Sequence, residues 1–340
     1  MPDRILVLGT GVIGSVYALR FAKAGCAVTA VARGARLEAL RKNGLRIRNA
    51  FLGDEEAADI QVVDSVPAGT GFDMIIVAVR GDQILGALSK TSDSAAPAIV
   101  VVGNNLGDYD AQADLAGRER LVLGFGAFGG YRDGGAIVYV DGRTRAKPGD
   151  MRRARTTLGV LAPIARPALD AALPAFARAG LPTSECGDMR SWLACHAALV
   201  FPLAGAMYAA GGDQARFCGT RDAILLGVRA SKELFRSLRL VGYGTEPESL
   251  KRLLAMPEWL LVPLLQKRFA GEGTRIAMFG HANAAGGRGE IGAQALVLDG
   301  IARRAGAPLP SWDRLLPHLA QKPGALPLPD GSRILKYRPW

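Results

Sequence analysis

The sequence predicts an α/β protein with two domains, a parallel β-sheet domain over residues 1–160 and an all-helical domain over residues 161–340. Two observations predict this arrangement. Short apolar runs rich in β-branched residues alternate with helical stretches in the first half, and strand patterns almost disappear after about residue 160. A chain of 340 residues has room for about two domains. Its 49% hydrophobic and 21% charged residues exclude a disordered chain, a collagen and a coiled-coil rod.

The strands expected in the first domain are short apolar runs, of the kind that a parallel sheet buries on both faces. They are Arg4–Leu8, Ala27–Ala32, Ile60–Val63, Met74–Val79, Ala98–Val102 and Leu121–Phe125. A helix is expected over Ser15–Ala24, and another over Leu37–Asn43, which Gly44 ends. Because strands and helices alternate, we expect helices on both faces of the sheet. Gly134–Val140 predicts an added strand that pairs in a hairpin.

The second domain shows helical patterns almost throughout. The expected helices are Ala168–Ala179, Ser191–Ala210, Arg221–Val241, Glu248–Ala255, Pro257–Phe269, Glu290–Ala305 and Ser311–Leu319. The aliphatic stretch Leu253–Phe269 is expected to pack in the core or in a homodimer, because its polar residues do not form one basic face. The tail Lys322–Trp340 is rich in proline and glycine, so we expect an extended segment there.

The chain is basic, with a formal net charge of +11. It has no long basic run and no interleaving of basic and aromatic residues, so we expect a small-molecule substrate and no nucleic acid. The N-terminus enters a strand pattern at once, without the features of a signal peptide. The later apolar stretches are too short or too interrupted for the ~20 residues of a membrane span. These features predict a cytoplasmic protein without a membrane partner.

The cysteines and histidines predict no metal site. Cys26, Cys186, Cys195 and Cys218 show no CxxC spacing, and the three histidines are not paired at ligand spacing. We expect reduced thiols that are mostly buried.

A glycine-rich motif follows the first expected strand. Its residues are Gly9, Thr10, Gly11, Val12, Ile13 and Gly14. In a GxGxxG turn between a strand and a helix, the first glycine permits the tight turn and the second lets the backbone approach a pyrophosphate. The third lets the helix lie close to the sheet. The helix N-terminus then offers N–H groups to the phosphates. The motif predicts a dinucleotide site.

The end of the second strand indicates which dinucleotide is bound. An NAD site usually has a carboxylate there, which accepts hydrogen bonds from the ribose 2′-hydroxyl. This chain has Arg33 instead, in the run Ala32–Arg36, which contains no carboxylate. A guanidinium suits a 2′-phosphate, so the sequence favours NADP(H). Arg80, which follows the strand Met74–Val79, is a second candidate cation on the adenosine side.

Four stretches of the N-terminal half resemble the ketopantoate reductase family. They are Leu8–Gly14 with Arg33, then Val77–Gln83, Gly103–Gly107, and Gly124 through Gly135. Phe201–Leu203 and Gly289–Ile291 fall where the family has similar elements. The resemblance implies a Rossmann domain, a helical domain, an active site in the cleft between them, and NADPH-dependent reduction of a 2-oxo acid.

The resemblance also implies residue roles. Arg33 and Arg80 would hold the 2′-phosphate. Asn104 would lie near the nicotinamide ribose and the substrate, and Glu290 near the cofactor or the substrate hydroxyls. Asn105 replaces the family's usual glycine, which predicts a different local backbone.

One departure from the family concerns its proton donor, a lysine two positions after a tryptophan. After Trp192 this chain has Leu193 or Ala194 at that position, and neither donates a proton. The sequence therefore predicts a divergent member that lacks the catalytic lysine. Hydride transfer to a carbonyl still needs an acid or a fixed cation.

Three side chains are candidates for that role. His196 follows on the same helix, although its direction differs from that of the lysine, and a hydrogen-bonded core histidine is the alternative. His281 lies in a segment for which we expect a loop, and its imidazole titrates near neutrality. Glu290 becomes a useful acid if it is desolvated, or it is a solvated carboxylate at a helix N-terminus.

The leading hypothesis is an NADPH-dependent reductase of a small 2-oxo acid or related carbonyl. Two alternatives stay open. One is an opine- or imine-type dehydrogenase, in which an amine condenses with an oxo acid before reduction. The other is a protein that binds NADP(H) without catalysis.

Overall fold

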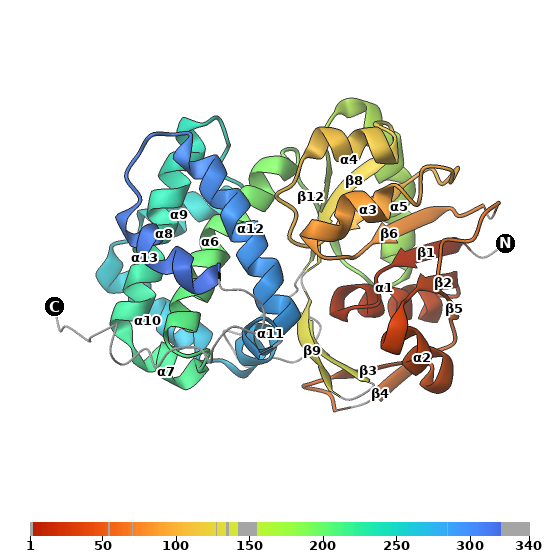
Figure 1. Cartoon of the computed structure of the whole chain (residues 1–340), viewed down its shortest axis with the longest axis horizontal. Helices are drawn as coiled ribbons and strands as arrows, with labels where there is room; N and C mark the ends of the chain where they lie inside the picture. Colours follow the sequence, from red (N-terminus) through yellow and green to blue (C-terminus); the bar gives the residue numbers. More distant parts are fainter. Residues whose placement is uncertain are drawn as a thin grey trace. The chain divides into compact units, whose positions relative to one another are not determined.

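The computed structural model describes residues 3–320 except 54, 70, 127, 134–135, 142–154 and 284, and it leaves the side chains of 278–287 undescribed. The chain forms two compact units (Figure 1). The first extends to Met189 and the second begins at Arg190. The expected tail from Lys322 onward lies outside the described residues. The first unit therefore continues past residue 160, where the sequence predicted the boundary.

The first unit contains an eight-stranded sheet in the order β12-β11-β8-β7-β6-β1-β2-β5. Its parallel strands are β1 (Arg4–Leu8), β2 (Ala27–Val31), β5 (Gln61–Val63), β6 (Met74–Val77), β7 (Ile99–Val102) and β8 (Leu121–Phe125). Beyond β8 the sheet continues with β11 (Thr156–Val160), antiparallel to β8, and ends at the edge strand β12 (Thr183–Glu185), parallel to β11. Each expected strand of the parallel sheet is confirmed.

The order of the parallel strands is that of a Rossmann domain. Counted along the chain, β5-β2-β1-β6-β7-β8 is the order 3-2-1-4-5-6. The direction of winding reverses between β1 and β6, and right-handed crossovers in opposite directions put their helices on opposite faces. Ligands bind at such a reversal, outside the carboxyl ends of the strands. The predicted α/β class is confirmed.

The helices of the first unit follow its strands. They are α1 (Val12–Lys23), α2 (Gly34–Asn43), η1 (Gly81–Gln83), α3 (Ile84–Leu88), α4 (Tyr109–Ala116), η2 (Pro163–Ala165) and α5 (Arg166–Arg178). Helix α1 contacts α5, and α3 contacts α4. Gly44 ends α2 with φ +69°, a conformation that favours glycine.

Helix α5 belongs to the sheet domain, whereas the sequence placed the helix Ala168–Ala179 in the second domain. Its apolar side chains Leu169 and Phe176 are part of the core that α1 shares with the sheet. The Phe176 ring lies 5.7 Å from Tyr17 and 5.3 Å from Phe21, edge to face in both cases. This aromatic packing holds α5 on the first unit.

A second, four-stranded sheet covers α1. Its order is β4-β3-β10-β9, from β3 (Leu45–Asn49), β4 (Glu55–Ala58), β9 (Gly129–Asp133) and β10 (Ala136–Val140). Strands β9 and β10 are antiparallel, so the expected hairpin strand is confirmed over Ala136–Val140. Arg20 of α1 donates two hydrogen bonds to Glu56 of β4, at 3.0 and 2.8 Å. The small sheet is therefore fixed to the helix that follows the glycine motif.

The second unit is helical throughout its described part. Its helices are α6 (Met189–Ala209), α7 (Gln214–Gly219), α8 (Arg221–Leu240), α9 (Ser249–Ala255), α10 (Glu258–Phe269), α11 (Glu272–Asn283), α12 (Ala285–Arg303) and α13 (Pro310–Leu319). Helix α6 is long and apolar enough to cross a membrane, but 78% of its most apolar window is buried within the protein. Packing as the core helix of this unit accounts for its composition.

Glycines let neighbouring helices of the second unit approach closely. A Cβ at Gly205 of α6 would lie 3.3 Å from the Leu315 side chain of α13, and one at Gly227 of α8 would lie 2.9 Å from Leu203. The N-terminus of α13 is capped by Glu233 of α8, whose carboxylate accepts backbone N–H bonds from Ser311 at 2.9 Å and from Trp312 at 3.0 Å.

Candidate nucleotide-binding site

The glycine motif forms the turn between β1 and α1, beside the strand β6 at the reversal of the sheet. Gly9 has φ +96°, and a Cβ there would lie 2.5 Å from the carbonyl oxygen of Ala78. A Cβ at Gly14 would lie 1.9 Å from the carbonyl oxygen of Gly9. Both glycines are therefore required by the packing of the protein itself, because any side chain would displace backbone.

Gly11 is different, because nothing in the described protein lies within 4 Å of a Cβ built on it. Its φ of −71° is available to any residue. Neither sterics nor backbone conformation explains a glycine at this position. A ligand that approaches the backbone closely would explain the glycine, and this is the expected role of the second glycine of the motif.

The N-terminus of α1 is open for an anion. Gly11 is the N-cap, and no described side chain accepts a hydrogen bond from the first turn. The first turn also contains no acidic residue. The partial positive charge of the helix end and its unpaired N–H groups are thus offered toward the turn, as in other phosphate-binding turns.

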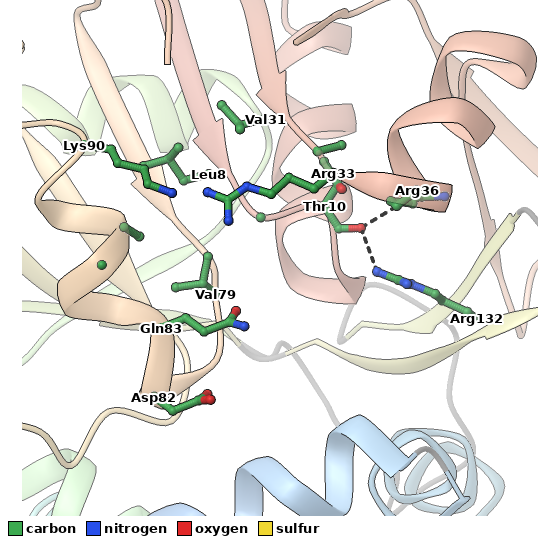
Figure 2. A pocket seen from close by; sticks show the side chains of 14 residues that line it. Leu8, Thr10, Val31, Arg33, Arg36, Val79, Asp82, Gln83, Lys90 and Arg132 are labelled. Atoms are coloured by element: carbon green, nitrogen blue, oxygen red, sulfur yellow. Dashed lines mark hydrogen bonds between the residues drawn. The ribbon is translucent and has the colours of Figure 1, made fainter. Parts of the chain in front are cut away.

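A cavity of about 520 Å³ lies against this turn. Its lining comes from the glycine turn, the end of β2, the start of α2, the β6–α3 segment and β9 (Figure 2). The lining residues are Leu8, Gly9, Thr10, Val31, Ala32, Arg33, Arg36, Val79, Asp82, Gln83, Gly86, Ala87, Lys90 and Arg132. We call it the glycine-loop pocket. Its volume is in the range of small-molecule sites.

The charges of the glycine-loop pocket are mostly positive, with four cations against the single carboxylate of Asp82 among the described lining residues. Arg33 is the N-cap of α2, directly beyond the end of β2, and Figure 2 shows its side chain extended into the pocket in the direction of Lys90. Within the described part of the chain, neither of these two cations has a hydrogen bond or an ion pair. Both are available to an anionic ligand.

The other two arginines of the pocket converge on one backbone oxygen. Arg36 Nε donates to the carbonyl oxygen of Thr10 at 3.2 Å, and Arg132 Nη2 donates to the same oxygen at 3.4 Å (Figure 2). Arg36 Nη2 also donates to Ser15 Oγ at 3.2 Å. Burial, and then the positive charge of Arg132, lower the pKa of Arg36 to about 10. An anion in the pocket would offset that repulsion.

Arg80 lies near this site but not in the lining. Its guanidinium donates to both carboxylate oxygens of Asp82, at 3.2 Å from Nε and 3.0 Å from Nη2. Both side chains are more than two-fifths exposed, so the pair is weak. A ligand beside Arg80 would compete with Asp82 for this guanidinium.

The Asn-Asn segment follows β7. Asn104 is half-buried and lies outside the glycine-loop pocket. Asn105 is buried, and its side-chain amide exchanges two hydrogen bonds with Gln112 of α4, at 2.8 and 2.9 Å. Asn105 therefore has a structural role, because its side chain fixes the segment to α4.

The catalytic candidates other than Asn104 lie in the second unit. His196 is on α6, where its ring stacks on Trp192 with centroids 5.3 Å apart and planes at 4°. Leu193 and Ala194, the two residues that the resemblance implies for the lysine position, are buried at 3% and 0% exposure. Among the described residues, no group of three or more His, Cys, Asp or Glu side chains could hold a metal ion.

Glu290 lies on α12, half-buried, close enough to Tyr208 of α6 to affect its titration. Burial raises the pKa of Tyr208, the charge of Arg288 opposes that rise, and Glu290 adds to it. The expected loop around His281 is wrong, because α11 continues to Asn283. The helix continues through Gly280, which had suggested a loop. The side chain of His281 is not among those that the structure describes.

Sequence reasoning missed Arg36, Lys90 and Arg132. Arg36 lies three residues after Arg33, so both side chains project from the start of α2. This i, i+3 spacing is visible in the sequence and could have indicated that Arg36 lies beside Arg33. Lys90 follows the short helix α3. Arg132 reaches the turn from β9, 122 positions away from Thr10 in the chain, and no local pattern predicts that contact.

The fold and this pocket define a class, that of proteins with a Rossmann domain, a basic pocket at its glycine turn, and a following helical unit. Comparison with known proteins then gives the family. Residues 5–153 match the family model described as ketopantoate reductase PanE/ApbA. Over this segment, which is less than half of the chain, the protein resembles the ketopantoate reductase family, as its motifs predicted.

Two similar proteins are named 2-dehydropantoate 2-reductase, and a third, with another name, shares the fold. The 2-dehydropantoate 2-reductase of Pyrococcus horikoshii is 26% identical over 190 residues, which span 56% of this chain and 58% of that relative. The solved 2-dehydropantoate 2-reductase of Geobacter metallireducens GS-15 superposes with a TM-score of 0.68 at 17% identity, covering 93% of this chain and 98% of that one. D-mandelate dehydrogenase, solved with NADH and anilino(oxo)acetate, gives 0.66 at 14% identity, covering 93% and 96%.

Proposed function

We propose that the protein is an NADP(H)-dependent reductase of a small 2-oxo acid or a related carbonyl compound. The observation that carries the proposal is the glycine-loop pocket, in which Arg33 stands where an NAD site has a carboxylate. Ketopantoate reductase relatives support the reaction class. A structural neighbour that holds NADH and anilino(oxo)acetate supports a nicotinamide cofactor and an oxo-acid substrate.

The residues of the pocket fit such a cofactor. The open space at Gly11 and the uncapped N-terminus of α1 suit a pyrophosphate, and the unpaired cations Arg33 and Lys90 suit the extra phosphate of NADPH. Arg80 is a further ligand of that phosphate if it leaves Asp82. The bound cofactor supplies the hydride.

The protein must supply the proton and stabilise the developing alkoxide. We propose His196, His281 and Glu290 as candidates for that proton donor, and Asn104 as a positioning group for the substrate. If the substitution of one of them, as in Glu290→Gln or His196→Gln, lowers kcat with little change in NADPH affinity, that residue is the donor. If none of the substitutions changes turnover, these assignments are wrong.

The cofactor is tested by titrating NADPH and NADH against the protein and three variants. We expect Arg33→Ala to weaken NADPH binding by about 10- to 100-fold, the effect of a lost charge-assisted bond, and to leave NADH binding unchanged. Arg41→Ala is the matched control, since Arg41 is exposed on the same helix and outside the pocket. Arg80→Ala should have the smaller effect of the two pocket-side substitutions. A preference for NADPH that survives Arg33→Ala would contradict the 2′-phosphate assignment.

The reaction is tested by following NADPH oxidation with a panel of small 2-oxo acids, each with and without an added amine. Turnover without amine supports the proposal. Turnover that requires the amine indicates the opine- or imine-type alternative instead. Tight NADPH binding without turnover on any compound indicates a non-catalytic binding protein.

A further inference from the structure

The second unit contains a separate basic cavity of about 730 Å³. Its walls are the C-terminal half of α8, the segment 243–245 and the helix α9. The lining residues are Lys232, Phe235, Arg236, Arg239, Tyr243, Gly244, Thr245, Lys251, Leu254 and Ala255. We call it the α8–α9 pocket. Among these described residues are four cations and no carboxylate.

The cations come from two elements that face one cavity. Lys232, Arg236 and Arg239 follow one another at positions i, i+4 and i+7 of α8, which places them along one side of that helix. Lys251 is contributed by α9. Basic residues are common in the last turn of a helix because of its dipole, and that explains Arg239 alone. It does not explain the two cations one and two turns earlier, or the lysine on the other helix.

Little within the protein neutralises these charges. In the described part of the chain, neither Arg236 nor Arg239 has a hydrogen bond or an ion pair. Lys232 Nζ donates to the carbonyl oxygen of Met256 at 3.2 Å, and no described carboxylate forms an ion pair with it. Lys251 pairs with Glu248 at 3.1 Å, but both side chains are exposed and such pairs are weak.

The part of the lining formed by residues 243–245 is positioned by backbone hydrogen bonds. Helix α8 ends in a Schellman motif, in which Gly242 has φ +91° and the N–H of Tyr243 donates to the carbonyl of Leu238 at 3.0 Å. The next residue is held on α6, because the N–H of Gly244 donates to Ser191 Oγ at 2.8 Å. Tyr243 is thus held on the wall of the cavity, with the guanidinium of Arg190 5.3 Å from its ring centre.

We propose that the α8–α9 pocket binds a small organic phosphate with two or more negative charges. The guanidinium groups of Arg236 and Arg239 each match a phosphate in a bidentate manner. Phe235, Tyr243 and Leu254 offer apolar surface for the organic part, and the volume suits a small molecule. A cavity of this volume, bounded by two helices and a loop, suits a small ligand.

The test is calorimetric titration of the full chain with inorganic triphosphate and with ATP as probes. Because the glycine-loop pocket is also basic, we expect two binding sites. The double variant Arg236→Gln with Arg239→Gln should weaken one of them by about 10- to 100-fold, and Arg33→Ala should weaken only the other. The matched control is Arg252→Gln, an exposed arginine of α9 outside the lining.

The organic part is tested with Tyr243→Ala, which should weaken ATP and leave triphosphate unchanged. If that variant does not fold, Leu254→Ala serves the same purpose. The inference is wrong if the double variant binds triphosphate as the unsubstituted chain does, or if Arg252→Gln weakens binding equally, since the charge would then act diffusely. NADPH binding should be the same in the double variant, so a failure of the proposed reductase function and a failure of this site are distinguishable.

Discussion

The two basic cavities differ in where their positive potential comes from. In the glycine-loop pocket the backbone N–H groups at the N-terminus of α1 add to four cationic side chains, two of which hold the turn by one carbonyl oxygen. In the α8–α9 pocket it comes from side chains, and Arg236, Arg239 and Lys251 are exposed. A backbone site depends on glycines and is sensitive to their replacement. A side-chain site depends on charge, and solvent and salt weaken it.

The largest expected effect is that of Gly14→Ala, which breaks the glycine-loop pocket through the fold itself. The added Cβ would overlap the carbonyl oxygen of Gly9 at 1.9 Å, so the turn or α1 must move. We expect a loss of about 3 kcal/mol or more in the free energy of unfolding. Denaturant unfolding measures it, and a variant as stable as the unsubstituted protein would show that the turn is not as rigid as described.

Gly11→Ala separates ligand contact from packing in the same turn. Its Cβ meets open space and its φ suits alanine, so we expect the free energy of unfolding to change by no more than about 1 kcal/mol. NADPH affinity should fall by about tenfold or more, because the Cβ occupies the path of the pyrophosphate. Unchanged NADPH binding in a folded Gly11→Ala protein would argue against a phosphate at this turn.

The next largest expected difference between the two pockets is in how strongly salt weakens ligand binding. Raising NaCl from about 50 to 500 mM shortens the screening length severalfold, so we expect triphosphate binding at the α8–α9 pocket to weaken by about tenfold or more. NADPH binding should weaken less, since helix N–H groups and a turn of fixed shape contribute to it. Titrations at several salt concentrations give both slopes, and equal slopes would remove the distinction drawn between the two sites.

The smallest expected effect is on acid stability and concerns the second unit. His318 of α13 is half-buried, its Nδ1 has no hydrogen-bond partner among residues 3–320 as described, and burial lowers its pKa below the ordinary value of 6.5. The folded state therefore binds fewer protons than the unfolded state as pH falls below 6.5, and stability is lost through the lowered pKa. His318→Gln should reduce the pH dependence of the melting temperature between about pH 4 and 7. An unchanged dependence would show that other groups govern it.

The sequence identified the parallel strands because fully apolar runs such as Met74–Val77 and Ile99–Val102 have few other interpretations. It missed β12, since Thr183–Glu185 is a short, polar edge strand, and it missed β3, whose alternating pattern lies between polar segments. Helix α5 was predicted, but the sequence did not show which unit its apolar face packs against, because tertiary contacts decide that. The resemblance to the ketopantoate reductase family, drawn mainly from motifs in the first half of the chain, was confirmed over residues 5–153.

The site was predictable where backbone geometry requires a residue type, as at Gly9 and Gly14. Arg33 was predictable from its place after β2, because strand ends at the reversal of a parallel sheet meet the ligand. Lys90 and Arg132 were not, since contacts across the chain determine their positions. The cations that α8 contributes to the α8–α9 pocket have regular helical spacing. Cations with this spacing are also common on solvated helix faces, so only the cavity in the structure distinguishes a binding site from such a face.

The carbonyl oxygen of Thr10 accepts hydrogen bonds from Arg36 of α2 and from Arg132 of β9. Two elements far apart in the sequence therefore hold the same turn. The turn is thereby preorganised, so the binding of a dinucleotide there does not include the entropic cost of ordering the turn. The small sheet, which contains β9, contributes to this order. Substitutions along β9 and β10, remote from any ligand, could tune how firmly the cofactor is held while every contacting residue stays the same.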